Sequence, residues 1–250
     1  MADRFWSTYR RPAVAVKRDG CTPSITTVFL CQEILMTGQP ARRVLWGIGT
    51  PRTMRPHWAL HELSLLYETR PIRSRTGTTS DASFTALNTR QKIPILEDGE
   101  VVLGESAAII TYLSDRYSNG RASLTPPNPS DRARATEWCF FIMTELDATS
   151  LYVLRRHHDL ANIYGDAPAA VQSARGYFAK QLTYVDRVLG SGRQYLMGEQ
   201  FTTADILLTT CLTWAVELKI SLHDSCDAYL QRTTMREAYR RAYATNHMTT

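Results

Sequence analysis

The pattern of apolar and polar positions changes along the chain. Up to about residue 117, short apolar runs alternate with turn-forming residues, whereas beyond 132 the apolar positions recur at helical spacing. An apolar run from Val44 to Ile48 predicts a strand, and a second strand is expected at 68–72. Leucines on one face predict a helix over about 54–66 between them. The pattern therefore predicts an α/β region followed by an all-helical region.

The segment from residue 88 to 113 carries the strongest local signals. Alternating apolar positions flank Asp98-Gly99, a dipeptide suited to the two-residue turn of a β-hairpin. A helix is expected to begin at Ser106, whose side chain can cap the free N–H groups of its first turn. The Ile93–Pro94 bond is a candidate for the cis form, because X-Pro bonds adopt it most readily. The segment is predicted to form strand, turn, strand and helix, and the helix start can hold a carboxylate.

Two further helix starts are predicted from capping residues. Pro56 belongs in a first turn, where its missing N–H costs nothing, so the cap of the first helix is expected at Thr53. Thr202 with Asp205 three residues later is a variant of the capping box, and Phe201 with Ile206 can form the hydrophobic staple.

The chain divides into four parts by composition. Residues 1–43 are basic and lack periodicity, which predicts an extension that is disordered and dispensable, or not made if translation begins at Met36. Asp3 and Asp19 count against a transit peptide. A domain at 44–117 is followed by a linker at 118–131, rich in Pro, Gly and Ser, and an all-helical domain at 132–250.

Composition and charge exclude several classes of function. The net charge of +5 lies mostly in residues 1–43, so the remainder has no electrostatic footprint for nucleic acid. No apolar run approaches the roughly 20 residues that a membrane span needs. The 5 cysteines form neither a CxxC pair nor a Cys/His cluster with metal-ligand spacing, so no metal is expected. An odd cysteine count fits a reducing compartment, and the cytoplasm is the expected location.

An ordered set of residues in the α/β region resembles the glutathione-binding half of the glutathione transferase family. The set comprises Asn88, Pro94, Leu96, Glu105, Ser106, Ala108, Ile109, Tyr112 and Leu113. The chain departs from the family pattern at Thr89 and Gln91, in the loop before the predicted strand. The Thr202–Asp205 motif is similar to the helix-capping motif of the family's second domain, so the resemblance covers about 44–215. It implies a thioredoxin-like N-terminal domain followed by an all-α domain.

The resemblance also implies how glutathione is held. Glu105 and Ser106 are expected at its γ-glutamyl end, and the backbone of Ile93, next to Pro94, is expected to pair with the cysteinyl residue. Lys92 is a candidate for the glycyl carboxylate. The second substrate is expected between the domains, against some of Trp138, Phe141, Met143, Tyr152, Tyr164 and Trp214.

The residue that stabilises the glutathione thiolate is unusual. Members of the family use a Tyr, Ser or Cys near the first helix, but none of these lies between Val44 and Glu62. Thr53 and Thr50 are the hydroxyl candidates, and Arg52 is a third candidate through its charge. Arg55-Pro56-His57 resembles the bacterial class that carries a Cys, with Arg52 or Thr53 in the Cys position. The scaffold is thus similar to bacterial members, while the disulfide-exchange chemistry is excluded.

The resemblance implies an enzyme that conjugates the glutathione thiolate to a small hydrophobic electrophile in detoxification. Glutathione would be the co-substrate, no metal would take part, and the enzyme would form a homodimer without nucleic-acid or membrane partners. Two alternatives stay open: a non-catalytic glutathione-binding or protein-interaction module of the same fold, and a glutathione-dependent thiol transferase or peroxidase.

Overall fold

The computed structural model describes residues 42–118 and 123–249. The predicted extension at 1–43 lies outside the described residues, except Arg42 and Arg43. Arg43 already belongs to the first strand, so that strand begins one residue earlier than its apolar run predicts. None of the described helices combines the length and the hydropathy needed to cross a membrane.

The first part of the described chain is an α/β domain built on a mixed sheet. Its elements are β1 (Arg43–Trp46), α2 (Pro51–Glu62), β2 (Glu68–Arg70), η1 (Thr78–Ser80), α3 (Ala82–Leu87), β3 (Ile95–Asp98), β4 (Val101–Gly104) and α4 (Ser106–Tyr117). The strand order is β2-β1-β3-β4, with β2 parallel and β3 antiparallel to β1. This order and the β-α-β then β-β-α connection make the domain thioredoxin-like, as predicted.

The hairpin and the segment before it differ in detail from the prediction. Asp98 pairs with Val101, so the two-residue turn is Gly99-Glu100 and Asp98 is the last residue of β3. Gly99 has a φ of 63°, the left-handed value that favours glycine. The predicted polar loop before residue 88 contains the short helix α3, whose Phe84 is buried against Trp46. The Ile93–Pro94 bond is cis, as predicted.

The second part of the described chain is helical. Its elements are α5 (Pro129–Phe141), η2 (Ile142–Leu151), α6 (Tyr152–Leu154), η3 (Arg155–Asp159), α7 (Ala161–Tyr164), α8 (Pro168–Leu189), α9 (Thr203–Glu217), α10 (Asp224–Thr234) and α11 (Glu237–Asn246). The segments η2 and η3 are π-helical, a geometry that is rare and often found at functional sites.

The helix α9 starts as its capping residues predict. Thr202 is the N-cap, and the Asp205 carboxylate accepts a hydrogen bond from the Thr202 backbone N–H at 2.8 Å. Phe201 and Ile206, the predicted staple, are both buried in the hydrophobic core. The helix is buried along most of its length, which explains why its sequence is apolar on every side.

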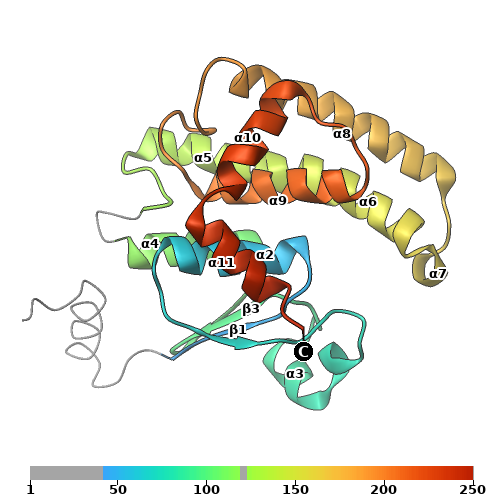
Figure 1. The fold of residues 1–250 in the computed structure, drawn as a ribbon. Coiled ribbons are helices and arrows are strands. Elements are labelled where there is room, and N and C mark those ends of the chain that lie inside the picture. The colour runs from blue at the N-terminus through green and yellow to red at the C-terminus, as the bar shows by residue number, and fades with distance from the viewer. Residues whose placement is uncertain (1–41, 119–122, 250) are drawn as a thin grey trace, which may run out of the picture. The chain divides into compact units, whose positions relative to one another are not determined.

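The last helix returns to the α/β domain. Figure 1 shows the chain leaving α10 among the other helices and running into α11, which lies across α2. Trp58 of α2 meets Tyr239 of α11 edge to face, with ring centroids 4.9 Å apart. The C-terminal end of α11 thereby comes to the N-terminal end of α2, where the sequence predicts the thiolate site.

Candidate functional site

The first helix begins at Pro51 and its cap is Thr50, so the predicted cap at Thr53 is wrong. The Thr50 hydroxyl oxygen accepts from the backbone N–H of Thr53 at 3.0 Å, and the Thr53 hydroxyl oxygen accepts from the backbone N–H of Thr50 at 3.0 Å. Together they form a capping box with Thr in place of the usual Glu or Gln. Pro51, and not Pro56, is the proline at the first helical position, and Pro56 lies buried inside the helix.

Thr53 is fully buried beneath the C-terminal helix. Its hydroxyl lies 2.7 Å from Oδ1 of Asn246 and 2.9 Å from the carbonyl oxygen of Thr50. Asn246 Oδ1 also accepts from the backbone N–H of Gly49, and its Nδ2 donates to the carbonyl of Thr50 at 3.2 Å. Because the Gly49 N–H can only donate, Oδ1 is the acceptor end of this amide. Asn246 therefore fastens the loop between β1 and α2, and no local pattern in the sequence points to it.

Two arginines of α2 share one buried carboxylate. Asp147, in η2, pairs through Oδ2 with Nη2 of Arg55 at 2.6 Å and through Oδ1 with the guanidinium of Arg52. Burial by itself raises the pKa of Asp147, but the charges of Arg55 and Arg52 outweigh it and hold that pKa below its ordinary value. The ion pairs join the thioredoxin-like and helical domains, because Arg52 and Arg55 belong to the first and Asp147 to the second.

Arg55 extends this network to Ser106. Its Nη1 donates to Ser106 Oγ at 3.1 Å and lies 3.1 Å from the sulfur of Met143, while Nε donates to Thr210 at 2.8 Å. Sequence reasoning used Arg55 only within a motif and missed Asp147. A lone acid beside the buried Leu146 was the available signal for a buried ion pair.

Ser106 is not the cap of α4. The N-cap residue is Glu105, no side chain caps the helix, and Ser106 is the first helical residue, 2% exposed. The contact with Arg55 places its hydroxyl, so a tertiary partner overrides the local capping preference. Glu105 has a φ of 66°, a strained value for a residue with a side chain, and its exposed carboxylate pairs with Arg90 at 3.0 Å.

The loop around the cis peptide lies against the loop after β1. A Cβ on Gly47 would lie 2.7 Å from Cβ of Ile93, so only glycine allows this approach. Ile93 precedes β3, whose pairing begins at Ile95, and Pro94 is buried. Lys92 is exposed, and its carbonyl accepts from Asn88. The structure thus brings Thr50, Arg52, Ile93, Glu105 and Ser106 to one side of the thioredoxin-like domain, while their roles stay predictions.

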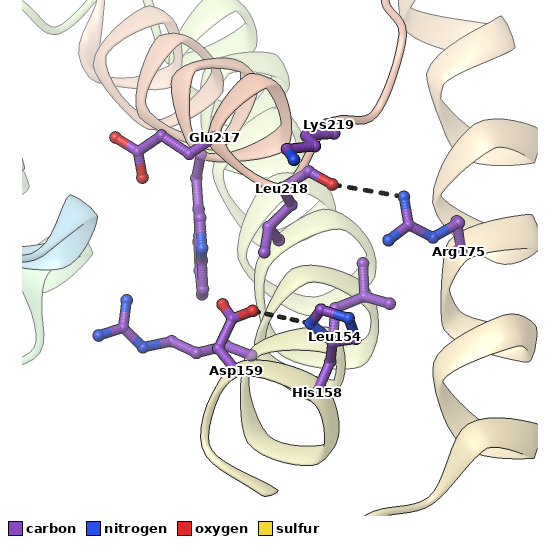
Figure 2. A pocket seen from close by; sticks show the side chains of 9 residues that line it. Leu154, His158, Asp159, Arg175, Glu217, Leu218 and Lys219 are labelled. Atoms are coloured by element: carbon purple, nitrogen blue, oxygen red, sulfur yellow. Dashed lines mark hydrogen bonds and ion pairs between the residues drawn. The ribbon is translucent and has the colours of Figure 1, made fainter.

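A cavity of about 400 Å³ opens on the helical domain between η3, α8 and the end of α9. Figure 2 shows Leu154 and Leu218 among charged side chains, and Trp214 completes the apolar part of the lining. The charged and polar lining residues are Arg155, His158, Asp159, Arg175, Glu217 and Lys219. His158 pairs with Asp159 at 2.9 Å, and Arg175 donates to the carbonyl of Leu218 at 3.4 Å.

Of the six residues expected at the second-substrate pocket, Trp214 alone lines this cavity. Tyr152 packs under the guanidinium of Arg52, 4.4 Å from its ring centre. Trp138 stacks on Tyr184 at 5.2 Å and meets Phe141 edge to face, which places both in a separate aromatic cluster.

Histidines and cysteines of the described chain form no metal site. No group of three His, Cys, Asp or Glu side chains among residues 42–118 and 123–249 could hold an ion. Burial lowers the pKa of His57 to about 4, since its ring is enclosed between the Tyr67 hydroxyl and the carbonyl of Gly47. Burial raises the pKa of Cys139 to about 11 and that of Cys211 to about 12. Both thiols therefore stay protonated, and the two cysteines serve as small apolar side chains.

Comparisons with known proteins agree with the fold. A family model described as the glutathione S-transferase N-terminal domain matches residues 43–115, and one described as its C-terminal domain matches residues 141–233. The glutathione S-transferase GstA of Escherichia coli O157:H7 is 31% identical over 158 residues, which are 61% of this chain and 73% of that protein. Glutathione S-transferase 3 of Zea mays is 31% identical over 64% of this chain and 72% of its own.

Solved structures show the same architecture. A glutathione transferase from Methylococcus capsulatus is 30% identical, has a TM-score of 0.68 and aligns over 82% of this chain and 98% of its own. A theta-class enzyme from Xanthomonas axonopodis pv. citri, solved with glutathione bound, has a TM-score of 0.70 at 24% identity over 84% of this chain and 99% of its own. The two family models together cover most of the described residues, and the chain belongs to the glutathione S-transferase family.

Proposed function

We propose that this protein is an enzyme that joins the thiolate of glutathione to an electrophile, with Thr50 as the hydroxyl that stabilises the sulfur. The carbon–sulfur bond forms as the thiolate attacks the electrophilic carbon, and the leaving group departs with its electron pair. The thiol proton is lost to solvent, because a thiol near pKa 8.5 needs only modest stabilisation to ionise at neutral pH.

The direction of the protons in the Thr50–Thr53 pair carries this proposal. Thr53 has one hydroxyl proton, and its acceptors are Asn246 Oδ1 at 2.7 Å and the Thr50 carbonyl at 2.9 Å. With that proton committed, Thr53 cannot donate to Thr50 Oγ, which lies 3.0 Å away. Thr50 Oγ already accepts from the Thr53 N–H, and its own proton is left to donate to Thr53 Oγ, a bond that it can exchange for one to a thiolate.

The difference in burial between Thr53 and Thr50 supports the same assignment. Thr53 is 0% exposed, whereas Thr50 is partly exposed at the start of the helix. The helix N-terminus adds favourable partial charge beside Thr50. Thr53 is therefore proposed to orient Thr50, and Thr50 to contact the sulfur.

The rest of glutathione is proposed to lie along the residues expected from the sequence. Ser106 Oγ accepts from Arg55, which leaves the Ser106 proton for the γ-glutamyl carboxylate. Glu105 would receive the amine in place of Arg90, Ile93 would pair with the cysteinyl backbone, and Lys92 would face the glycyl end. Arg52 donates to Asp147 through Nε and Nη2, and its positive charge is proposed to favour the bound thiolate. A homodimer in the cytoplasm is part of the same proposal.

Two observations weigh on the alternatives. The described cysteines Cys139, Cys211 and Cys226 all have raised pKa values through burial, so none supplies a thiolate for thiol-transferase chemistry. A threonine hydroxyl is a weaker donor than a phenol, which keeps the non-catalytic binding module as the second candidate.

A titration of bound glutathione decides between them. The thiolate absorbance of the native complex is expected to give a pKa at least about one unit below that of the free thiol, which is roughly 1.36 kcal/mol of preference for the charged form. Thr50→Val should lose most of this shift, and Thr50→Ser, which keeps the hydroxyl and the cap, should retain it. A native complex that titrates like free glutathione would leave only the binding module.

Asn246→Ala tests the proton order within the pair. Without the Asn246 acceptor, the Thr53 proton is shared between the Thr50 carbonyl and Thr50 Oγ, so the bound thiol should titrate between the native and the Thr50→Val values. Ala242→Gly is the matched control, because Ala242 is buried in the same helix and makes none of these hydrogen bonds. Equal shifts in both variants would show that only the packing of α11 matters.

A further inference from the structure

Four cationic side chains converge where the two domains face each other. Arg75 and Lys92 come from the thioredoxin-like domain, and Arg155 and Arg156 come from η3 of the helical domain. The guanidinium carbon of Arg156 lies 4.6 Å and that of Arg75 5.8 Å from the centre of the Tyr164 ring, and the charge of Arg75 also acts on Arg155. A hydrogen bond from Arg75 and the charges of Arg75, Lys92 and Arg156 lower the pKa of Tyr164. We call Arg75, Lys92, Arg155 and Arg156 the basic cluster.

The basic cluster lacks the carboxylates that usually balance such a group. Within the described residues, no carboxylate oxygen lies within 4.0 Å of a side-chain nitrogen of these four residues. Nε of Arg156 is buried and has no hydrogen-bond partner there. Burial, and next the charge of Arg75, lower the pKa of Arg155, although the charges of Asp159 and Glu217 oppose this. The four cations of the basic cluster outnumber these two carboxylates, and an excess of positive charge from two domains favours an anion between them.

Arg155 also belongs to the cavity of Figure 2. Its guanidinium carbon lies 6.0 Å from the centre of the Trp214 ring, and both side chains line the cavity of about 400 Å³. Arg155 therefore belongs both to the basic cluster and to the cavity lined by the Trp214 ring. A ligand that fits both would have an apolar ring and an acidic group a few bonds away.

We propose that the electrophile of this enzyme carries an acidic group, such as a carboxylate, which Arg155 and Arg75 hold while its apolar part lies against Trp214. This inference rests on the proposed function and narrows the hydrophobic electrophile to an amphiphilic one. The glycyl carboxylate of glutathione is the competing anion. Arg155 and Trp214 belong to the helical domain, whereas glutathione is proposed to lie on the thioredoxin-like domain, which favours the second substrate.

A matched pair of substrates tests the proposal. The acid 4-chloro-3-nitrobenzoate and its neutral amide both react by attack of the thiolate on the ring carbon, with loss of chloride and its electron pair. Each enzymatic kcat/KM is divided by the rate constant for free glutathione, which removes the difference in intrinsic reactivity. The native enzyme is expected to favour the acid by about tenfold or more, since a hydrogen bond to a charged group contributes about that factor.

The variants locate the effect. Arg155→Gln should raise the KM for the acid about tenfold while the KM values for the amide and for glutathione stay within about twofold. Arg75→Gln, at an exposed loop position where folding is not at risk, should do the same to a smaller extent. Arg134→Gln, on the exposed face of α5, removes one charge elsewhere on the helical domain and should change none of these values.

Three results would overturn the proposal. The first is a native enzyme with no preference for the acid, and the second is an equal rise in the KM for acid and amide in Arg155→Gln. The third is a rise in the KM for glutathione in that variant, which would assign the basic cluster to the glycyl carboxylate of glutathione. Should neither compound be conjugated, the proposed function fails. Calorimetric titration of the acid alone then decides the site: binding that Arg155→Gln abolishes supports it, and no binding to the native protein refutes it.

Discussion

Asp147 and Asp205 are both fully buried, yet the two carboxylates differ in the kind of partner that surrounds them. Asp147 faces the guanidinium groups of Arg52 and Arg55. Asp205 faces neutral donors: the backbone N–H groups of Leu196 and Thr202, and the hydroxyl of Tyr229 at 2.9 Å.

The pKa of each carboxyl follows the charge of its partners. Burial raises the pKa of Asp205, and its hydrogen bonds offset this only in part. Burial acts on Asp147 too, but two positive charges lower its pKa below the ordinary value. At Asp205 neutral donors satisfy the buried carboxylate without fully offsetting the effect of burial on its pKa, whereas at Asp147 two full charges do so.

The two residues also connect different parts of the chain. Asp205 lies three residues from the helix cap that it stabilises. Asp147 instead pairs with Arg55 and Arg52, which lie 92 and 95 residues away along the chain. Asp205 stabilises one helix start, and Asp147 joins α2 of the thioredoxin-like domain to the helical domain.

The largest effect is expected from Asp147→Asn. The substitution leaves Arg55 buried without a counter-charge, so the free energy of unfolding should fall by about 3–5 kcal/mol, measured by urea denaturation at pH 7. Arg55 would also cease to hold Ser106, so affinity for glutathione should fall in any variant that still folds.

The double variant Asp147→Leu/Arg55→Met serves as the control. Removal of both buried charges should restore a large part of the lost stability, because an apolar pair avoids the cost of desolvation. If the single variant is as stable as the native protein, the ion pairs do not hold the domains together.

His57 provides a second test of burial without a compensating charge. Its pKa falls from 6.5 to about 4 on folding, so the unfolded chain binds more protons between these values, and stability falls as the pH is lowered through this window. The loss from His57 between pH 7 and pH 5 should be about 2 kcal/mol.

In His57→Gln the free energy of unfolding should depend much less on pH over that range. The pKa of His61 is lowered as well, first by burial and then by Arg241, so His61→Gln is the control and should show a smaller change in the same direction. A pH dependence that His57→Gln leaves intact would show that other groups are responsible.

Asp205→Asn is expected to cost less than Asp147→Asn. The partners of Asp205 are neutral, and the amide oxygen of Asn can replace one carboxylate oxygen. The amide nitrogen would face another donor, so the free energy of unfolding should fall by about 1–3 kcal/mol. Chemical denaturation at pH 7 measures the difference, and a cost above that of Asp147→Asn would reverse the comparison.

The smallest effect is expected in the pH dependence of stability, to which Asp147 and Asp205 contribute with opposite signs. Because the folded pKa of Asp147 is lowered, the stability that this residue contributes is lost as the pH falls below about 3.8, the ordinary value for the carboxyl. A raised folded pKa makes Asp205 regain stability as the pH falls toward 3.8. Denaturation midpoints from pH 6 to pH 3 should therefore fall more steeply in Asp205→Asn, and less steeply in Asp147→Asn, than in the native protein.

The elements that could be predicted from the sequence depend on neighbours a few residues apart. The Thr202–Asp205 capping box, the cis Ile93–Pro94 bond and the order of strands and helices in the thioredoxin-like domain were all confirmed. The resemblance to the family also rests on such short ordered motifs, and the family models confirm it.

Errors arose where two local interpretations were equally good. Pro51 and Pro56 both suit a first turn, and the capping box of Thr50 with Thr53 escaped notice because its third residue is not Glu or Gln. The hairpin turn was misplaced by one residue, and the short helix α3 was missed within a polar segment.

Only the tertiary structure decided which side chains act on the candidate site. The partner of Thr53 is Asn246, 193 residues away, and the partner of Ser106 is Arg55, 51 residues before it. Periodicity and capping describe a residue's own helix or strand, but they carry no information on which helix packs over it. The sequence by itself determined the fold, whereas packing between distant segments decided that Thr53 is buried and that its hydroxyl bonds to Asn246.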